Sequence, residues 1–359
     1  MAAIRAGFVL ALALAAEPAS AAMDYIDCHV HLLGGKDFPG AAKAAIAAMD
    51  EGGIKTCVVM SPPSVSGGDH APFDWKEFKD SLQEYRGRFA FLGGGGTLNP
   101  LLHSAGENPD DQTKRKFEET ANEIVAAGAV GFGEIAAHHL SLAEGHPYEC
   151  VAPDHPLLLL LADIAAKNDV VIDLHLDIVP ADMAMPPRFT SPLDPPRVKA
   201  NLANFEKLLA HNPNAKFVWA HAGSDPLANR SVTLCRDLLT KHPNLYMSLR
   251  VATHGGGKGG GGGGGMMPDF VRATMAFTPD GEINPDWLKL LKDFPDRFVI
   301  GGDQFIASPK MTGGGPGLTF TKGAPMTRER TAKFLAALPA DLASKIGIEN
   351  AQRLYKLGR

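Results

Sequence analysis

The stretch YIDCHVHLLGG, residues 25–35, places two histidines two positions apart on a run of apolar residues. Alternate side chains of a β-strand point to the same face, so His29 and His31 are expected to project from one side, with Asp27 one alternation below them. Two imidazoles on one face are an arrangement that a metal ion can use. The stretch is therefore predicted to be a first strand that carries metal ligands.

Seven further β-rich runs follow, and they alternate with longer segments of helical spacing. The predicted strands are residues 25–32, 54–62, 88–96, 129–136, 169–177, 215–223, 244–251 and 297–305. The helical segments include residues 41–52, 73–85, 114–128, 157–167, 198–212 and 285–294. This alternation is typical of a parallel sheet covered by helices, and eight units favour a closed α/β fold, the (β/α)8 TIM barrel, with long βα loops at its C-terminal face.

A doubly wound open sheet is the alternative fold. It would require a G-x-G-x-x-G motif after the first strand, and the sequence HLLGGKDFPG at residues 31–40 does not contain one. The glycine-rich segment 255–265 also lacks the G-K-[ST] ending of a phosphate loop, so we interpret it as a flexible linker.

The composition limits the range of partners. The 359 residues are 45% hydrophobic and 21% charged, which is enough for one barrel-type domain or for two ordinary domains. The net charge is −5 and no run of lysine or arginine would track a phosphate backbone, so nucleic acid is not an expected partner. We expect a small-molecule substrate, and the sequence is compatible with a homo-oligomer.

Residues 1–22 contain one arginine, a short apolar run and a small-residue ending, the pattern of a cleaved secretory signal. The catalytic domain would then comprise residues 23–359, in a periplasmic or secreted protein. The apolar run is too short to remain as a membrane anchor. Translation from Met23 would instead give a cytoplasmic protein.

Metal-competent side chains recur near the C-terminal ends of five predicted strands. They are His29 and His31 on the first strand, Glu134 on the fourth, His175 on the fifth, His221 on the sixth and Asp303 on the eighth. Each follows an apolar run, and such groups are costly to bury unless they are paired or bound to a metal. All six offer nitrogen or oxygen ligands, and no C-x-x-C motif suggests a structural zinc site.

The order H-x-H, Glu, His, His, Asp on successive strands resembles the amidohydrolase superfamily of metal-dependent TIM-barrel hydrolases. The ending IGIENAQRLYKL, residues 346–357, is similar to the closing helix of the amidohydrolase-related (amidohydrolase 2) branch. The resemblance extends from residue 24 to the end of the chain.

The resemblance implies a site with one or two divalent metal ions. His29, His31, His175 and Asp303 would hold the first metal. His221 would orient or activate water in a mononuclear site, or bind the second metal in a binuclear one. Glu134 would bridge two metals, which is the interpretation we favour, or accept hydrogen bonds from ligands around a single metal. Zinc is the default ion for imidazole and carboxylate ligands, with manganese, iron and nickel as alternatives.

Other residues follow from the same chemistry. Asp303 would accept a proton from the attacking water and pass it to the leaving group. Arg250 would bind a substrate carboxylate, or form a salt bridge within a loop. Asp27 and Asp173 would hold imidazole tautomers, or make buried hydrogen bonds without catalytic weight.

Three further histidines are expected in the βα loops, where they could line the pocket, and they are not expected to be metal ligands. They are His138, His139 and His254.

Three functions remain open from the sequence. The leading one is an exported metal-dependent hydrolase that acts on an amide, lactone, ester or related bond of a small molecule. The second is a non-oxidative decarboxylase of a small carboxylic acid that uses one metal and His221. The third is a non-catalytic protein that binds a metal or solute, which the proton-transfer carboxylate Asp303 argues against.

Overall fold

A computed structural model describes residues 23–65, 72–142, 146–189, 191–251, 269–311 and 325–358. The predicted signal segment 1–22, His254 and the glycine-rich segment 255–265 lie outside the described residues. Among the described residues, no helix has the length and apolar character needed to cross a membrane.

The strands form one closed parallel barrel, which confirms the predicted (β/α)8 fold. They are β1 (Tyr25–Leu33), β2 (Ile54–Met60), β3 (Phe89–Gly94), β4 (Gly131–His139), β6 (Val171–Leu176), β9 (Lys216–Ala222), β10 (Leu245–Leu249), β11 (Phe298–Ile300) and β12 (Gln304–Ala307). Their order is β11-β10-β9-β6-β4-β3-β2-β1-β12, and pairing of β11 with β1 closes the barrel. The C-terminal ends of the strands therefore meet at one rim.

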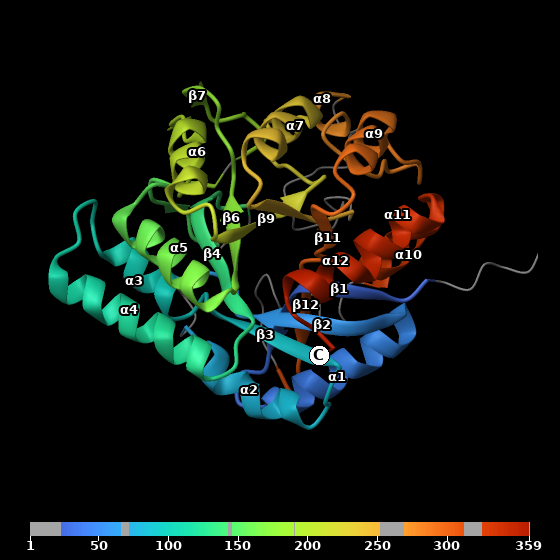
Figure 1. Cartoon of the computed structure of the whole chain (residues 1–359), viewed down its shortest axis with the longest axis horizontal. Helices are drawn as coiled ribbons and strands as arrows, with labels where there is room; N and C mark the ends of the chain where they lie inside the picture. Colours follow the sequence, from blue (N-terminus) through green and yellow to red (C-terminus); the bar gives the residue numbers. More distant parts are fainter. Residues whose placement is uncertain are drawn as a thin grey trace, which may run out of the picture.

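Helices surround the strands (Figure 1). The longer ones are α1 (Phe38–Gly52), α2 (Trp75–Gln83), α4 (Asp111–Ala126), α5 (Pro156–Asn168), α6 (Leu202–His211), α7 (Val232–Lys241), α9 (Pro285–Asp293) and α10 (Pro325–Ala337). Shorter ones are α3 (Leu98–Ser104), α8 (Asp269–Arg272), α11 (Ala340–Ser344), the π-helix η2 (Lys345–Glu349) and α12 (Asn350–Leu354). All six predicted helical segments coincide with helices.

Helix bounds follow local capping chemistry. α2 is shorter than its predicted segment because Asp74 and Glu77 form a reciprocal capping box at its start. α1 ends at Gly52 and is capped by Gly53, whose left-handed backbone (φ 69°) lets the chain turn into β2.

An apolar cluster draws side chains from many strands at once. It includes Val58, Leu92, Val171, Val218 and Val299, which come from β2, β3, β6, β9 and β11. Side chains from so many strands meet only inside a closed barrel, so this cluster is its packed interior.

The eighth predicted strand is interrupted. β11 and β12 both pair with β1, through Asp27↔Ile300 and Val30↔Gln304, while residues 301–303 leave the ladder. The carboxylate of Asp27 accepts hydrogen bonds from the backbone N of Gly302 at 2.8 Å and from Nε2 of Gln304 at 2.7 Å. A Cβ on Gly302 would lie 2.5 Å from an oxygen of Asp27, so glycine is required here. The single strand predicted over 297–305 was therefore wrong in its middle.

β4 is longer than predicted. The predicted strand ends at Ala136, but β4 continues to His139. β5 (Glu149–Cys150) pairs antiparallel with the last residues of β4, through His138↔Cys150 and His139↔Glu149. The two histidines are therefore strand residues and were wrongly assigned to a loop.

Two further short strands, β7 (Met183–Ala184) and β8 (Arg197–Val198), pair antiparallel in the loop after β6.

Candidate metal centre

Four imidazoles surround the buried carboxylate of Glu134. Its Oε2 lies 3.4 Å from Nε2 of His29 and 3.4 Å from Nε2 of His31. Its Oε1 lies 2.8 Å from Nδ1 of His175 and 3.3 Å from Nε2 of His221. Each oxygen of one carboxylate thus faces a different pair of histidines.

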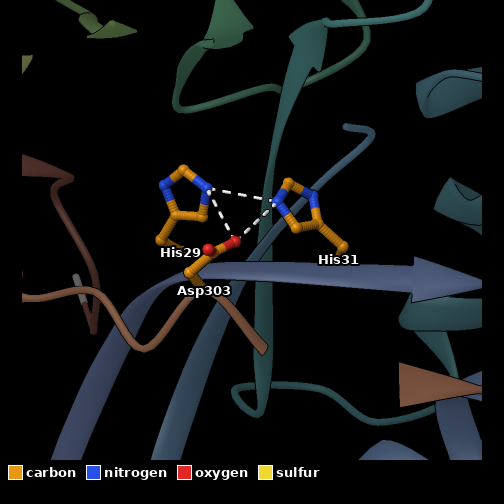
Figure 2. Close-up of side chains that lie close together, drawn as sticks. All are labelled: His29, His31 and Asp303. Atoms are coloured by element: carbon orange, nitrogen blue, oxygen red, sulfur yellow. Dashed lines mark hydrogen bonds and ion pairs between the residues drawn. The ribbon is translucent and has the colours of Figure 1, made fainter. Parts of the chain in front are cut away.

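Asp303 lies beside the first pair of histidines, His29 and His31. Its Oδ1 lies 3.4 Å from Nε2 of His31 and 3.9 Å from Nε2 of His29, and the two Nε2 atoms are 3.2 Å apart. Figure 2 shows these three side chains turned toward one another. The structure therefore brings all six predicted ligands to one rim, and their role as metal ligands stays a prediction.

Two sets of donor atoms are close enough to share a cation. One set is His29, His31 and Asp303, and the other is His29, Glu134 and His221, with the donor atoms of each set within 4.8 Å of one another. His175 is in neither set, and it reaches the centre through its contact with Glu134. The donors are nitrogen and oxygen only, which fits a divalent cation such as zinc.

His221 and Asp303 have unusual backbones. Their φ angles are 65° and 51°, in the left-handed region that costs a residue with a side chain about 1–2 kcal/mol. Asp303 is held in this state by Asp27, which binds both of its neighbours, and by its own backbone N, which donates to the carbonyl of His29 at 3.0 Å. Strain of this kind clusters at functional sites.

No protein-family model and no curated protein matches the chain. Solved structures do match. An amidohydrolase II is 13% identical, with 93% of this chain and 100% of that chain covered and a TM-score of 0.51. A dihydroorotase from Saccharomyces cerevisiae, in complex with 5-fluoroorotic acid, is 14% identical, with 93% and 84% covered and a TM-score of 0.50. The chain has the amidohydrolase fold. A 2,6-dihydroxybenzoate decarboxylase from Rhizobium superimposes less well, at a TM-score of 0.47, with 13% identity and 94% and 100% covered.

In this amidohydrolase fold, three of the four imidazoles have a partner for their outer ring nitrogen. Nδ1 of His29 lies 3.2 Å from Asp173, and Nδ1 of His31 lies 3.1 Å from the carbonyl of Met60. Nε2 of His175 lies 3.6 Å from Asp177.

The fourth imidazole differs, because the buried Nδ1 of His221 has no hydrogen-bond partner among the described residues. A hydrogen-bond partner at the outer ring nitrogen fixes the tautomer and orientation of a ligand ring, as it does for the other three imidazoles.

The two aspartates expected to hold imidazoles differ in what they do. Asp173 faces His29 across the barrel and not His175 of its own strand. Asp27 holds the turn before and after Asp303, and within the described part of the chain its one hydrogen bond with a histidine is from the backbone N of His29 at 3.2 Å. Of the two alternatives for Asp27, the structure therefore shows buried hydrogen bonds and no contact with an imidazole ring among the described residues.

The carboxylates of the centre are ionised. Burial opposes ionisation of Glu134, but His29, His175 and His221 hold its pKa well below the usual range. Burial also opposes ionisation of Asp303, and Arg250 and His221 hold its pKa well below the usual range. Both carboxylates are therefore in the form that binds cations.

The imidazoles differ in the direction in which their pKa values are shifted. Burial lowers the pKa of His29, but Asp173 and Glu134 outweigh it and raise this pKa well above the usual value. Burial likewise disfavours the charged form of His175, but Asp177 and Glu134 raise its pKa to about 10. Burial lowers the pKa of His221 to about 3, so the ring is neutral at neutral pH and one of its nitrogens offers a lone pair.

Arg250 lies one residue beyond β10 and faces the centre. Its Nη1 is 3.0 Å from Oδ2 of Asp303, so its ion-pair partner is one of the predicted ligands, in the turn between β11 and β12. The side chain is 26% exposed, and its buried Nε has no hydrogen-bond partner among the described residues. Part of the guanidinium thus remains able to bind another group.

Sequence reasoning missed Asp177 and Glu149, and it named His139 only as a residue that could line the pocket. Asp177 follows His175 by two positions in the sequence HLD, and strand alternation could have indicated it. His139 lies with its ring centroid 3.8 Å from that of His175, and Glu149 lies 3.2 Å from His139. No local pattern indicates the last two, because both depend on the pairing of β5 with β4.

Proposed function

We propose that the protein is a metal-dependent hydrolase that acts on an amide, lactone, ester or related bond of a small molecule. The position of Glu134 is the observation that carries this proposal. One carboxylate that faces His29 and His31 with one oxygen and His175 and His221 with the other is suited to bridge two cations.

The proposed ligand sets follow the two sides of Glu134. His29, His31 and Asp303 would hold one cation, His175 and His221 the other, with Glu134 shared between them. This groups His175 with His221, whereas the family resemblance implied His175 for the first metal. Zinc is the proposed ion, and it would activate water at neutral pH and polarise the carbonyl of the substrate.

Asp303 would act as the proton carrier. Oδ1 of Asp303 faces the histidine pair, and Oδ2 is held by Arg250. In this position, Oδ1 accepts a proton from the attacking water and returns it to the leaving group. A protein that only stores a metal has no use for such a residue.

Arg250 would bind a carboxylate of the substrate. A guanidinium has five N–H donors, and the ion pair with Asp303 uses only part of them. A substrate carboxylate is also what a decarboxylase would require, so Arg250 is compatible with both reactions. The placement of Glu134 between two histidine pairs favours two cations and hence hydrolysis.

The test is a comparison of reactions on one sample. Zinc-loaded protein would be assayed with a panel of esters, lactones, amides and aromatic carboxylic acids, beside Asp303→Asn as a control. We expect hydrolysis by the wild type and a loss of at least about a hundredfold in the variant. Release of carbon dioxide without hydrolysis would contradict the proposal, and turnover of no compound would favour a binding protein.

We also propose that the protein is exported, on the pattern of residues 1–22. Cell fractionation with mass spectrometry of the mature N-terminus tests this. A mature protein that begins near Met23 outside the cytoplasm is expected, and a full-length or cytoplasmic protein would contradict export.

A further inference from the structure

A buried polar network beside the centre has no part in the chemistry above. β5 brings Glu149 against the end of β4, where its carboxylate is 1% exposed. Oε1 of Glu149 accepts a hydrogen bond from Nδ2 of Asn99 at 2.6 Å, and Oε2 lies 3.2 Å from Nδ1 of His139. Each oxygen of this carboxylate is therefore used by a neighbour.

Asn99 ties the network to the strand that carries Glu134. Its Oδ1 accepts a hydrogen bond from the backbone N of Ala136 at 2.9 Å, and its Nδ2 also donates to the carbonyl of Ser64 at 3.0 Å. Because Ala136 is two residues after Glu134, the carboxylate of Glu149 is fixed relative to the centre.

His139 transmits this position to His175. The two ring centroids are 3.8 Å apart, with an interplanar angle of 45°. Glu134 and Asp177 lie at the two ring nitrogens of His175, and the rings of His139 and His221 both pack against it, with His139 the nearer. The bond to Glu149 prevents His139 from turning away.

We propose that Glu149 is a positioning residue for the cation bound by His175 and His221. It acts through His139, which it locks against the ring of His175. The inference rests on the proposed function, because it requires that His175 binds a cation. Substituting a residue that orients a metal ligand typically lowers the affinity for the metal about ten- to a hundredfold.

The test is a zinc titration of the full chain against a chromophoric chelator. Glu149→Gln keeps the shape of the side chain but removes its charge, and its amide cannot accept hydrogen bonds from both Asn99 and His139. We expect one of two binding steps to weaken about ten- to a hundredfold. It should be the step that His175→Ala abolishes, and the other step should be unchanged.

A double-mutant cycle separates this mechanism from general destabilisation. His139→Phe keeps an aromatic ring beside His175 but loses the bond to Glu149, so it should weaken the same step. Combining it with Glu149→Gln should add nothing. Asp74→Asn is the control, because Asp74 is a buried carboxylate that accepts hydrogen bonds from Ser61, Gly94 and Thr97 and, among the described residues, forms no hydrogen bond or ion pair with any of the four imidazoles. It should change thermal stability without changing either step.

The outcomes can be told apart. Two zinc ions in the wild type with unchanged binding in Glu149→Gln would overturn this inference alone. Equal weakening of both steps, or additive losses in the double variant, would reduce Glu149 to a structural role and overturn it as well. A wild type that binds no zinc at His175 would overturn the proposed function together with this inference.

Discussion

Arg250 and Asp303 form an ion pair in which Nη1 of the arginine lies 3.0 Å from Oδ2 of the aspartate. The other oxygen of Asp303 faces His31 at 3.4 Å, so the arginine lies on the side of the carboxylate away from the histidines. The positive charge is one reason that the pKa of Asp303 lies well below the usual range, against the effect of burial.

Replacing Arg250 should therefore shift the acidic limb of the pH–activity profile to higher pH. Activity needs ionised Asp303 and is lost as pH falls through its pKa, which is depressed in the wild type. Arg250→Met removes the charge and raises this pKa, so activity should disappear at a higher pH than in the wild type. The pH profile of kcat/KM on zinc-loaded protein measures this. Arg250→Lys should keep the limb near its original place, and an unshifted limb in Arg250→Met would refute the role of the ion pair.

Asp27→Asn should reduce turnover without removing metal. The amide group of asparagine would oppose the N–H donors of Gly302 or Gln304, and the turn that holds Asp303 would relax. We expect a loss of about 1–3 kcal/mol in the free energy of unfolding and a lower kcat at unchanged zinc content. Urea unfolding, kinetics and elemental analysis test this. Asp74→Asn should lower the free energy of unfolding but keep its kcat. A loss of kcat in Asp74→Asn as well would contradict a specific effect of Asp27 on turnover.

The partners of the outer ring nitrogens should control the two cations separately. Asp173→Asn should weaken the cation beside His29, and Asp177→Asn the cation beside His175, each by about ten- to a hundredfold. Zinc titrations of the two variants measure both steps. If both substitutions weaken the same zinc-binding step, the proposal that the two sides of Glu134 hold separate cations is contradicted.

Zinc should stabilise the protein, and more so at higher pH. A cation at a hundred times its Kd adds about 2.7 kcal/mol to the free energy of unfolding. The pKa of His175 is raised to about 10 and that of His29 is also raised, so zinc must displace protons from both. The gain in Tm on adding zinc should therefore increase from pH 6 to pH 8 in calorimetry. A gain that is constant or falls with pH would show that these rings do not bind the ion.

The barrel could be predicted because its signal is local. Apolar runs of strand length alternate with helical spacing along the whole chain, and each run reports its own burial. The break at residues 301–303 could not be predicted, because it depends on Asp27, which is 275 residues away from Gly302 in sequence. The extension of β4 to His139 likewise depends on its pairing with β5.

The six candidate ligands could be identified because each is a polar group that follows an apolar run. Their pairing could not, since it depends on which oxygen of Glu134 each ring reaches. The sequence also does not indicate which imidazole Asp173 would hold, and the barrel brings it to His29 on another strand. Residues that act through such contacts, including Asp177 and Glu149, become visible only when the strands are placed together.

The position of the cations is the most direct test of the account. Crystals of zinc-loaded protein, measured at the zinc absorption edge, should give two anomalous peaks about 3.5–4 Å apart, one on each side of Glu134. The first should lie beside His29 and His31, and the second beside His175 and His221. A single peak, or peaks away from Glu134, would contradict the proposed two-metal hydrolase.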